Sequence, residues 1–313
     1  MRILITGGAG FIGSNLSKYL IKQNHEVIII DDLSTGKESN LDGQKIRFIH
    51  EQVENLNNKI IKGMDLDFIV HLAAQASVPL SISQFYKSSS TNILSSIKIF
   101  EIAKVLNIPV IYASSSAVYG NLPLGNDITN EFDILSPYAL DKLTLENYAK
   151  LCNEIFSISS IGFRFFNVYG PFQDYKNPYS GVISLFASKA IRGEDIEIYG
   201  GTQTRDFIHV RDVCEIIYIA MHKIAGDSEP VSEVLNLGTG KSISINDLAQ
   251  MINKLRGSKS SLKILKPMDG DPIRSDGEYE KMKRFLSIHD FSFIELDQGL
   301  DEVIEWIETN DSK

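Results

Sequence analysis

Short apolar runs alternate with longer amphipathic stretches along the first half of the chain. Residues 2–6 and 27–30 are apolar runs of strand length, and residues 14–23 between them have the spacing of a helix. Further strands are predicted at residues 46–50, 68–74 and 109–113. Strands that alternate with helical segments favour a parallel sheet covered by helices on both faces, so we expect an α/β fold.

Two long helices are predicted in the middle of the chain, and one more at its end. Residues 92–106 read as a helix that ends before Pro109, and Pro137 is suited to the first position of a helix that continues to about residue 155. Residues 302–307 form an amphipathic stretch near the end of the sequence. No repeat, linker or low-complexity segment interrupts this pattern.

Composition narrows the choice of partners. The chain has 313 residues, of which 43% are hydrophobic and 23% charged, so a sizeable core can form. The net charge of −9 disfavours a nucleic acid or an anionic membrane as partner. An anionic substrate would therefore need a local cluster of arginine or lysine.

The two cysteines and the N-terminus add little chemistry. Cys152 and Cys214 are expected to be ordinary reduced thiols, with no metal. The sequence enters its first strand directly, without the basic and apolar segments of a signal peptide, and no apolar run approaches the ~20 residues needed to cross a bilayer. We expect a cytoplasmic protein.

The first strand leads into a glycine-rich turn. Gly7, Gly10 and Gly13 stand at every third residue, between a strand and a helix, and Asp31 ends the next strand. Glycines let the backbone approach a pyrophosphate, the helix N-terminus favours the anion, and the carboxylate can bind a ribose. This order predicts a Rossmann dinucleotide-binding unit, and the two acids Asp31 and Asp32 favour NAD over NADP.

Other segments of this half are suited to line the cofactor. The polar turn Leu33, Ser34, Thr35 and Gly36 can wrap the adenosine ribose. Leu72, Ala73 and Ala74 end a strand, where the small alanine side chains let the backbone lie beside a flat ligand. His71 stands at the end of the same strand, and we interpret it as a structural histidine.

The predicted fifth strand runs into three consecutive serines, and a tyrosine–lysine pair follows. Tyr138 and Lys142 are four residues apart, so they share one face of a helix. A lysine ammonium beside a phenol stabilises the phenolate and lowers the pKa of the tyrosine, which makes a general base.

With these motifs in place, the chain resembles an extended short-chain dehydrogenase/reductase of the nucleotide-sugar epimerase and dehydratase type, over residues 1 to about 274. The resemblance implies that Ser115, Tyr138 and Lys142 are the catalytic residues; Ser115 is chosen over Ser116 because it precedes Tyr119 by four residues. It implies these residues for binding of NAD: Gly7, Gly10, Phe11, Ile12, Gly13, Asp31, Asp32, Leu33, Ser34, Thr35, Gly36, Gln52, Val53, Leu72, Ala73, Ala74, Asn92, Ser114, Tyr138, Lys142 and Phe165.

The second half carries segments that resemble the family's substrate-binding part. Residues 162–171, 178–186, 197–200, 202–212, 236–240 and 270–274 follow its pattern. The resemblance implies these residues for binding of the nucleotide sugar: Ser77, Ser115, Ser116, Tyr138, Asn167, Val182, Ile198, Tyr199, Arg205 and Arg274. Arg205 and Arg274 would hold the diphosphate, as an acidic protein requires.

Two positions and one short segment depart from the family pattern. Gln52 stands where an aspartate usually contacts adenine, Phe172 replaces an arginine often found after the Tyr-Gly-Pro turn, and residues 276–280 differ from the usual sequence.

The family resemblance implies several reactions that begin by oxidation at C4 of the sugar. The dehydratases carry Asp-Glu directly after the catalytic threonine, and decarboxylases use a Glu in this turn; here Ser116 and Ala117 follow Ser115. Reductases favour NADPH, which the two acids oppose. We therefore expect an NAD-dependent epimerase that acts at C4 of a UDP-hexose, either glucose/galactose or their N-acetyl forms. The alternatives are a 4,6-dehydratase, a uronate epimerase or a non-catalytic NAD-binding regulator.

The resemblance also implies a domain plan and an assembly. Residues 1–165 are expected to form the NAD-binding Rossmann domain, to which residues of about 205–240 return, and residues 166–313 a smaller α/β substrate-binding domain. Family members usually pair through two helices, here about 92–106 and 138–155, so we expect a homodimer.

Overall fold

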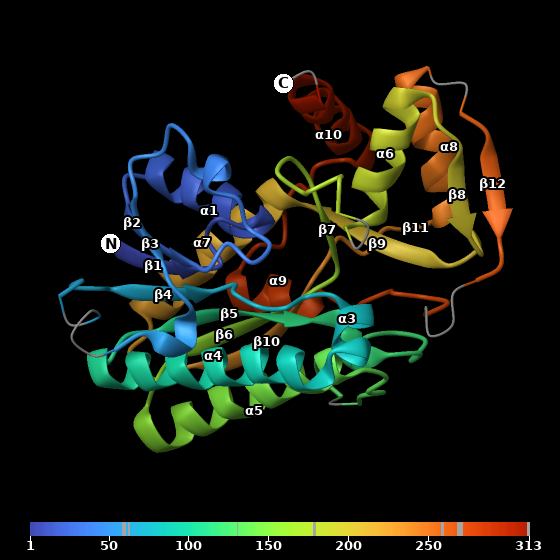
Figure 1. Ribbon diagram of the computed structural model, residues 1–313. Helices are drawn as coiled ribbons and strands as arrows, with labels where there is room; N and C mark the ends of the chain where they lie inside the picture. Colours follow the sequence, from blue (N-terminus) through green and yellow to red (C-terminus); the bar gives the residue numbers. More distant parts are fainter. Residues whose placement is uncertain are drawn as a thin grey trace. The chain divides into compact units, whose positions relative to one another are not determined.

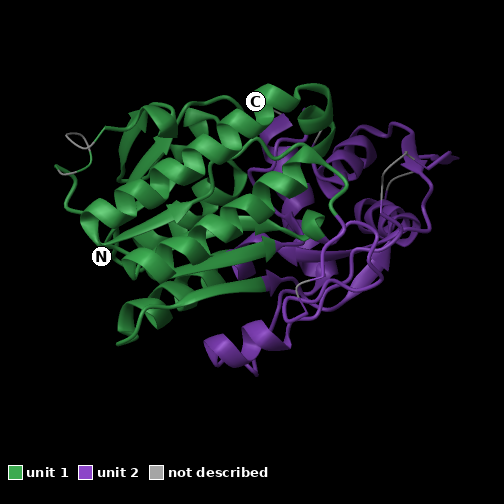
Figure 2. Cartoon of the chain, turned by 90° about the horizontal axis from the view of Figure 1, so that it is seen from below, with its two compact units in different colours: residues 1–118, 134–164, 214–235 green, residues 119–133, 165–213, 236–313 purple. Residues whose placement is uncertain are grey.

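The chain folds into two compact units, each made of three separate stretches of sequence. Unit 1 comprises residues 1–118, 134–164 and 214–235, and unit 2 comprises residues 119–133, 165–213 and 236–313 (Figure 2). The computed structural model describes residues 1–57, 61, 63–129, 131–177, 180–257, 260–267 and 272–311.

Unit 1 is built on a seven-stranded sheet with the order β10-β6-β5-β4-β1-β2-β3. The strands are β1 (Arg2–Thr6), β2 (Glu26–Asp31), β3 (Arg47–His50), β4 (Phe68–His71), β5 (Val110–Ser115), β6 (Ser160–Phe165) and β10 (Ser232–Leu237). Strand β1 pairs in parallel with β2 and with β4, and β4 pairs in parallel with β5. The order β3-β2-β1-β4-β5-β6 is that of a doubly wound Rossmann sheet, so the predicted fold class is confirmed.

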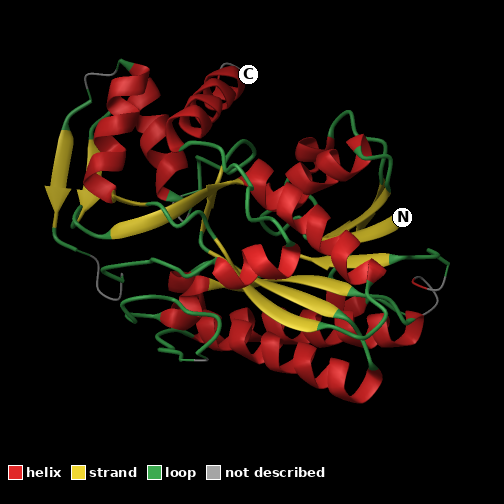
Figure 3. Cartoon of the chain, turned by 180° about the vertical axis from the view of Figure 1, so that it is seen from behind, coloured by secondary structure: helices red, strands yellow, loops and turns green. Residues whose placement is uncertain are grey.

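Helices cover both faces of this sheet (Figures 1 and 3). Helices α4 and α5 pack against each other below it in the view of Figure 1, while α1 and α7 lie on the other face, where Tyr19 and Tyr218 meet edge to face. The bounds are α1 (Phe11–Lys22), α3 (Val78–Ser83), α4 (Phe85–Leu106), α5 (Pro137–Phe156) and α7 (Val210–Gly226), with short 3₁₀ turns η1 (Glu38–Leu41), η2 (Val53–Asn55) and η3 (Ser116–Tyr119).

The strands of unit 1 are apolar along their whole length because both faces of the sheet are covered. Residues 3–5 and 27–30 are at most 1% exposed. Leu4, Ile28 and Ile69 pack with apolar residues of α4 and α5 into one core cluster. This core holds the carboxyl ends of the strands, where the predicted site residues lie, in a fixed arrangement.

Several element boundaries differ from the sequence expectations. Helix α1 begins at Phe11 rather than at residue 14, and α4 begins at Phe85 rather than at residue 92, because its first turns are rich in serine and lack the apolar spacing of a helix. Strand β5 extends to Ser115, and β4 ends at His71, so residues 72–74 lie in the loop that follows.

Unit 2 contains two small sheets and four helices among its described residues. One sheet has the order β11-β9-β7, and β12 pairs in parallel with β8. The bounds are β7 (Asn167–Tyr169), α6 (Val182–Arg192), β8 (Ile196–Tyr199), β9 (Thr204–His209), β11 (Ser242–Ser244), α8 (Ile245–Arg256), β12 (Leu262–Leu265), α9 (Glu280–Leu286) and α10 (Leu296–Asp311). Ile198, Leu248 and Val303 contribute to its core, where α6, α8 and α10 pack together.

In the described part of the chain, every helix is too short or too polar to cross a membrane. Pro178 and Tyr179 of the segment 178–186, and Gly270 and Asp271 of the segment 270–274, lie outside the described residues.

Candidate functional site

The glycine turn between β1 and α1 has the geometry of an anion site. A Cβ on Gly13 would lie 2.3 Å from the carbonyl oxygen of Gly7, and Gly7 itself has a φ of +69°, so both positions require glycine. Gly10 precedes α1 but supplies no side-chain cap, and the first turn of the helix contains no acid. The first-turn amides thus have no side-chain cap acceptor and no acid in their own turn, an arrangement that fits a pyrophosphate.

Asp31, at the end of β2, joins the glycine turn to the loop that follows. One carboxylate oxygen accepts a hydrogen bond from the Ala9 amide at 2.9 Å, and the other accepts from the Leu33 amide at 2.8 Å. Burial raises the pKa of Asp31, and the two amide contacts partly offset this. The residue predicted to bind a ribose is therefore also a structural link, a role that its sequence position did not reveal.

The loop after β4 is fixed by Asn92 of α4. The Asn92 side chain accepts from the Gln75 amide at 2.8 Å and donates to the Gln75 carbonyl at 3.2 Å. The Ala73 amide donates to the Thr6 hydroxyl at 3.3 Å, and a Cβ on Gly7 would lie 2.7 Å from the Ala73 nitrogen. Leu72 and Ala73 thus lie against the glycine turn.

Ser115, Tyr138 and Lys142 come together in unit 1, from the end of β5 and the first turns of α5. Helix α5 begins at Pro137, and the Ser136 hydroxyl accepts from the Ala139 amide at 3.2 Å. The Ser115 and Tyr138 hydroxyls are hydrogen-bonded. The Lys142 ammonium lies 5.7 Å from the centre of the Tyr138 ring.

The electrostatics of this group differ from the sequence expectation. Burial raises the pKa of Tyr138, and the contact with Ser115 only partly opposes this. Burial also lowers the pKa of Lys142 to about 8, and its ammonium donates to the Ala113 carbonyl at 2.8 Å. The pKa of Tyr138 is therefore raised, not lowered as we expected from Lys142, because loss of solvent dominates and the nearby charge of Asp141 adds to it.

His71 has a structural environment. Its Nδ1 lies 2.8 Å from the Thr6 hydroxyl, and its Nε2 lies 3.4 Å from the Ser96 hydroxyl. Burial, with a smaller effect of the Lys142 charge, lowers the pKa of His71 to about 3, so the ring is neutral.

A buried ion pair lies one turn further along α5. Glu146 accepts from Arg164 of β6 at 2.8 and 2.6 Å, and it also accepts a short hydrogen bond from Ser114. Both charged side chains are at most 6% exposed. Sequence reasoning missed this pair because Arg164 lies 18 residues away on a strand. The four-residue spacing of Glu146 from Lys142 indicates only that these two side chains share a face of α5.

In unit 2, strand β9 carries Arg205 beside a fully buried carboxylate. Asp206 accepts from the Thr239 amide and hydroxyl, from the Gly240 amide and from the Tyr279 hydroxyl, at 2.6–3.0 Å. Asn167 donates to the Asp206 carbonyl at 2.9 Å. This hub holds Asn167 and Arg205, two of the predicted substrate residues, on neighbouring strands.

Arg274 is exposed and lies beside the same strand. The Ile273 carbonyl accepts from the Thr204 amide at 3.0 Å, and the Ser275 amide donates to the Thr204 carbonyl at 3.2 Å. These two bonds place Arg274 next to Thr204, the neighbour of Arg205 in the chain.

Other predicted site residues have mixed environments. Val53 and Ile198 have side chains buried in the two cores, Tyr199 is 41% exposed, and Gln52 is exposed. Ser77 begins α3, where its hydroxyl accepts from the Leu80 amide at 3.3 Å. The ligand contacts assigned to these residues stay predictions.

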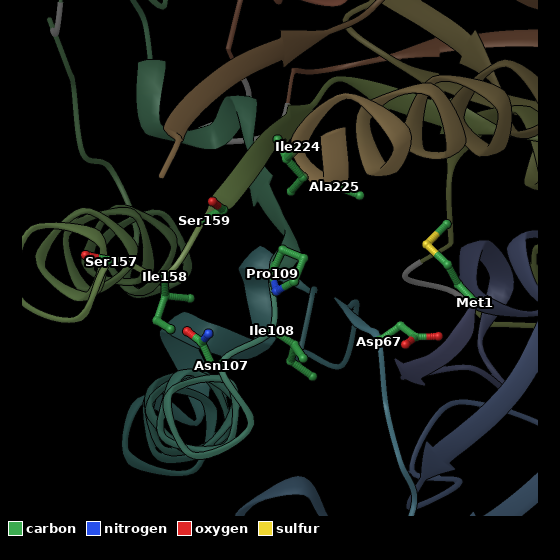
Figure 4. Close-up of a pocket in the computed structure, with 10 residues that line it drawn as sticks. All are labelled: Met1, Asp67, Asn107, Ile108, Pro109, Ser157, Ile158, Ser159, Ile224 and Ala225. Carbon is green, nitrogen blue, oxygen red and sulfur yellow. The ribbon is translucent and has the colours of Figure 1, made fainter. Parts of the chain in front are cut away.

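A pocket of about 470 Å³ lies elsewhere in unit 1 (Figure 4). Met1, Asp67, Pro109 and Ser159 line it, and each directly precedes a strand of the sheet. The pocket therefore belongs to the amino ends of the strands, whereas Rossmann folds bind their ligands at the carboxyl ends. It takes no part in the site described here.

Comparisons with known proteins find relatives that match almost the whole chain. A relative from Methanocaldococcus jannaschii, named as a putative UDP-glucose 4-epimerase, is 35% identical over 98% of this chain and 99% of its own. The UDP-glucose 4-epimerase of Thermotoga maritima, solved with UDP-glucose, superposes with a TM-score of 0.91 at 30% identity over 99% of both chains. A UDP-N-acetylglucosamine 4-epimerase from Methanobrevibacter ruminantium, in complex with UDP-N-acetylmuramic acid, has a TM-score of 0.89 at 34% identity over 99% of this chain and 98% of its own.

The wider set of similar proteins includes other reactions. UDP-glucuronic acid decarboxylases, a 5,6-dehydratase and a UDP-glucuronic acid 4-epimerase are among them. The model of the NAD-dependent epimerase/dehydratase family matches residues 3–238, which is most of the chain. The glycine turn, the acid that ends β2 and the serine–tyrosine–lysine group all lie within that match, and the chain belongs to the NAD-dependent epimerase/dehydratase family, with NAD as its cofactor.

Proposed function

We propose that the chain is an epimerase that inverts C4 of a UDP-hexose through a transient 4-keto sugar. The observation that carries the proposal is the meeting of Ser115, Tyr138 and Lys142 at the carboxyl edge of the sheet, without a carboxylate in the turn after Ser115. That turn consists of Ser116 and Ala117, and the Ala117 amide donates to the Ser115 hydroxyl at 3.1 Å. An acid here would be needed for elimination of water.

The residues that we assign to binding of NAD belong to unit 1. The amides at the start of α1 are assigned to the pyrophosphate, Asp31 to the adenosine ribose, and Leu72, Ala73 and Ala74 to the face of the cofactor. When bound, NAD accepts a hydride from the sugar and returns it, and its nicotinamide carries a positive charge.

Tyr138 is proposed to take the proton of the C4 hydroxyl as that carbon is oxidised. Ser115 hydrogen-bonds the same oxygen as it becomes a carbonyl, and Lys142 stabilises the phenolate by its charge. Because burial raises the pKa of Tyr138, positive charge near the ring is required to reach a phenolate at neutral pH. For inversion, the keto sugar must turn over and take the hydrogen on its other face, after which Tyr138 gives the proton back.

Unit 2 is proposed to hold the nucleotide. Arg205 and Arg274 are assigned to the diphosphate, and Asn167, Val182, Ile198 and Tyr199 to the rest of the UDP-sugar. Two guanidinium groups suit a diphosphate because each can form paired, charge-assisted hydrogen bonds.

The test is an assay of the purified protein with a set of UDP-sugars, followed by NMR of the products. We expect interconversion of UDP-glucose with UDP-galactose, or of their N-acetyl forms. Turnover of UDP-glucuronate alone would instead identify a uronate epimerase. A 4-keto-6-deoxy product would identify a dehydratase, and release of CO₂ a decarboxylase.

Replacement of the proposed general base, Tyr138, tests the mechanism. Tyr138→Phe should lower kcat by about 10³-fold while NAD stays bound, because general-base catalysis is typically worth about 10²–10⁴-fold. Tyr148→Phe, on the same helix, is the matched control and should leave turnover unchanged. Full activity of Tyr138→Phe would reject the mechanism.

A further inference from the structure

Helix α5 carries a buried carboxylate that the proposed mechanism does not use. Asp141 is 4% exposed and directly precedes Lys142 in the sequence. Burial of a carboxylate is costly unless hydrogen bonds or nearby charge compensate it. The contacts of Asp141 should therefore indicate what this residue does.

Asp141 is bonded to the amide that fixes the loop after β4. Asn92 donates to an Asp141 oxygen at 3.0 Å, and the same amide group donates to the Gln75 carbonyl at 3.2 Å. Both donor positions of the Asn92 side chain are thus used, and its oxygen accepts from the Gln75 amide. Asp141 consequently connects the helix of the catalytic pair with the loop proposed to line NAD.

Two carboxylates, those of Asp141 and Glu146, lie near Lys142, and only Glu146 has an arginine partner in the part of the chain that the structure describes. Glu146 faces Lys142 from the next turn of α5, but Arg164 of β6 neutralises it in a two-pronged ion pair. The hydrogen-bond partner of Asp141 among the described residues is the neutral amide of Asn92.

The other groups that face the pair carry no opposing charge. His71 of β4 is held neutral, β5 presents the Ala113 carbonyl and the Ser115 hydroxyl, and Ser81 of α3 accepts from the Tyr138 amide at 3.3 Å. Asp141 is therefore left as the dominant negative charge on this part of the site.

We propose that Asp141 is a positioning residue for the proposed epimerase reaction: its carboxylate keeps Lys142 a cation and, through Asn92, holds the NAD-lining loop against the catalytic helix. This inference rests on the function proposed above, and it adds a residue to that site. It assigns the protonation of the pair to a side chain outside the set proposed to bind sugar and cofactor.

The sign of the effect follows from charge. The Asp141 carboxylate raises the pKa of Lys142, because it stabilises the ammonium, and raises the pKa of Tyr138, because it disfavours the phenolate. Removal of the charge lowers both pKa values. The acid limb of the rate profile, which needs the phenolate, and the alkaline limb, which needs the ammonium, should then move together to lower pH.

The experiment compares Asp141→Asn with the wild-type holoenzyme. The variant keeps a hydrogen-bond acceptor for Asn92 but has no charge, so NAD binding should persist. We expect the whole pH profile of kcat/KM to shift down by about one pH unit, equivalent to a tenfold change in the phenolate-to-phenol ratio at fixed pH. Glu154→Gln, an exposed position on the same helix, is the control and should not shift the profile.

A second readout needs no substrate. The near-ultraviolet phenolate absorbance is titrated for each protein and for the same protein with Tyr138→Phe, and the difference reports Tyr138 alone. This midpoint should fall by a similar amount in Asp141→Asn. Asp141→Ser removes the same charge with a smaller side chain and should give the same shift.

The outcomes separate the two proposals. If Tyr138 titrates at the same pH in the wild type and in both variants, the inference is wrong, whether or not the protein is an epimerase. A lower rate with unmoved limbs would also overturn it, since that is what loss of packing alone produces. If the titration shifts but no UDP-hexose is epimerised, the proposed function fails and the role of Asp141 toward the tyrosine–lysine pair stands.

Discussion

At the scale of single residues, burial decides the protonation of His71, the histidine that ends β4. The pKa of His71 is lowered to about 3, whereas a histidine in an unfolded chain titrates near ~6.5. Between these values the unfolded chain binds more protons than the folded one, so folding stability falls as the pH drops below about 6.5.

This gives a stability prediction. Acidification from pH 6.5 to pH 5 should cost the wild type about 2 kcal/mol through His71, at ~1.4 kcal/mol per pH unit. His71→Gln cannot titrate and should lack this part of the loss, as measured by urea unfolding at several pH values. His209, whose pKa burial lowers to about 4, is present in both proteins and cancels from the difference. Identical pH dependence of the two proteins would contradict the assignment.

Residue types and their spacing in the sequence were enough to choose the principal site residues. They did not predict the surroundings of these residues in the fold. Tyr138 and Lys142 could be paired from their four-residue separation, and Asp31 could be chosen because it ends β2. The rise in the tyrosine pKa could not be predicted, because it depends on burial by elements distant in sequence. The same holds for Asp141, whose amide partner Asn92 lies 49 positions away.

At the scale of elements, α5 is tied to the sheet at two successive turns. Lys142 contacts the Ala113 carbonyl, and Glu146 holds both Ser114 of β5 and Arg164 of β6. These contacts fix the end of β5, which bears Ser115, against the helix that bears Tyr138. The distance between the two hydroxyls is thus set by elements rather than by loops.

The contribution of these contacts to stability can be tested at the ion pair between Glu146 of α5 and Arg164 of β6. Arg164→Leu leaves the Glu146 carboxylate buried without its partner and should lower the free energy of unfolding by about 3–5 kcal/mol. The double variant with Glu146→Leu should recover much of that loss, because no charge is then buried. Urea unfolding measures both. The exposed pair Lys150–Glu154 on the same helix is the control, and its removal should cost less than about 0.5 kcal/mol.

Element boundaries were predictable where the apolar pattern was strong. The bounds of β1 and the start of α5 agree with expectation, the latter because Pro137 and its serine cap define it. The first turns of α4, before residue 92, were missed because Ser88, Ser89 and Ser90 give no apolar signal, although Ser88 is buried.

At the scale of the whole molecule, α4 and α5 each expose an apolar stripe. The exposed fractions are 41–60% for Leu94 and Val105 on α4 and for Leu140, Leu151 and Ile155 on α5. On each helix two of these residues are eleven apart, and Ile155 follows Leu151 by one turn, so they share a face. Since the two helices pack side by side, they present one surface. We propose that it forms the interface of a homodimer.

Sedimentation provides the test of this assembly. The wild type should be a dimer at micromolar concentration, and Leu151→Lys with Ile155→Lys should be a monomer. Ile264→Lys, at an apolar position of unit 2 that is 64% exposed, is the control and should remain a dimer. A monomeric wild type would reject the interface.

The Rossmann order of the sheet was accessible from alternating strand and helix patterns, since each strand–helix step is local. The sequence pattern did not predict which segments make up each of the two units. Residues 119–133 belong to unit 2, although they stand between β5 and α5 of unit 1. Such a detour depends on long-range pairing, for example of Asn236 with Asp127, which adjacent residues do not encode.

The three-part make-up of unit 1 has a consequence for synthesis of the protein. Strand β10, which covers the outer edge of β6, is not made until about residue 237. A nascent chain that has released β6 from the ribosome therefore keeps an open strand edge for several seconds of translation, while the intervening residues of unit 2 emerge. During that interval the growing polypeptide is exposed to mispairing, and chaperones have their main opportunity to bind it.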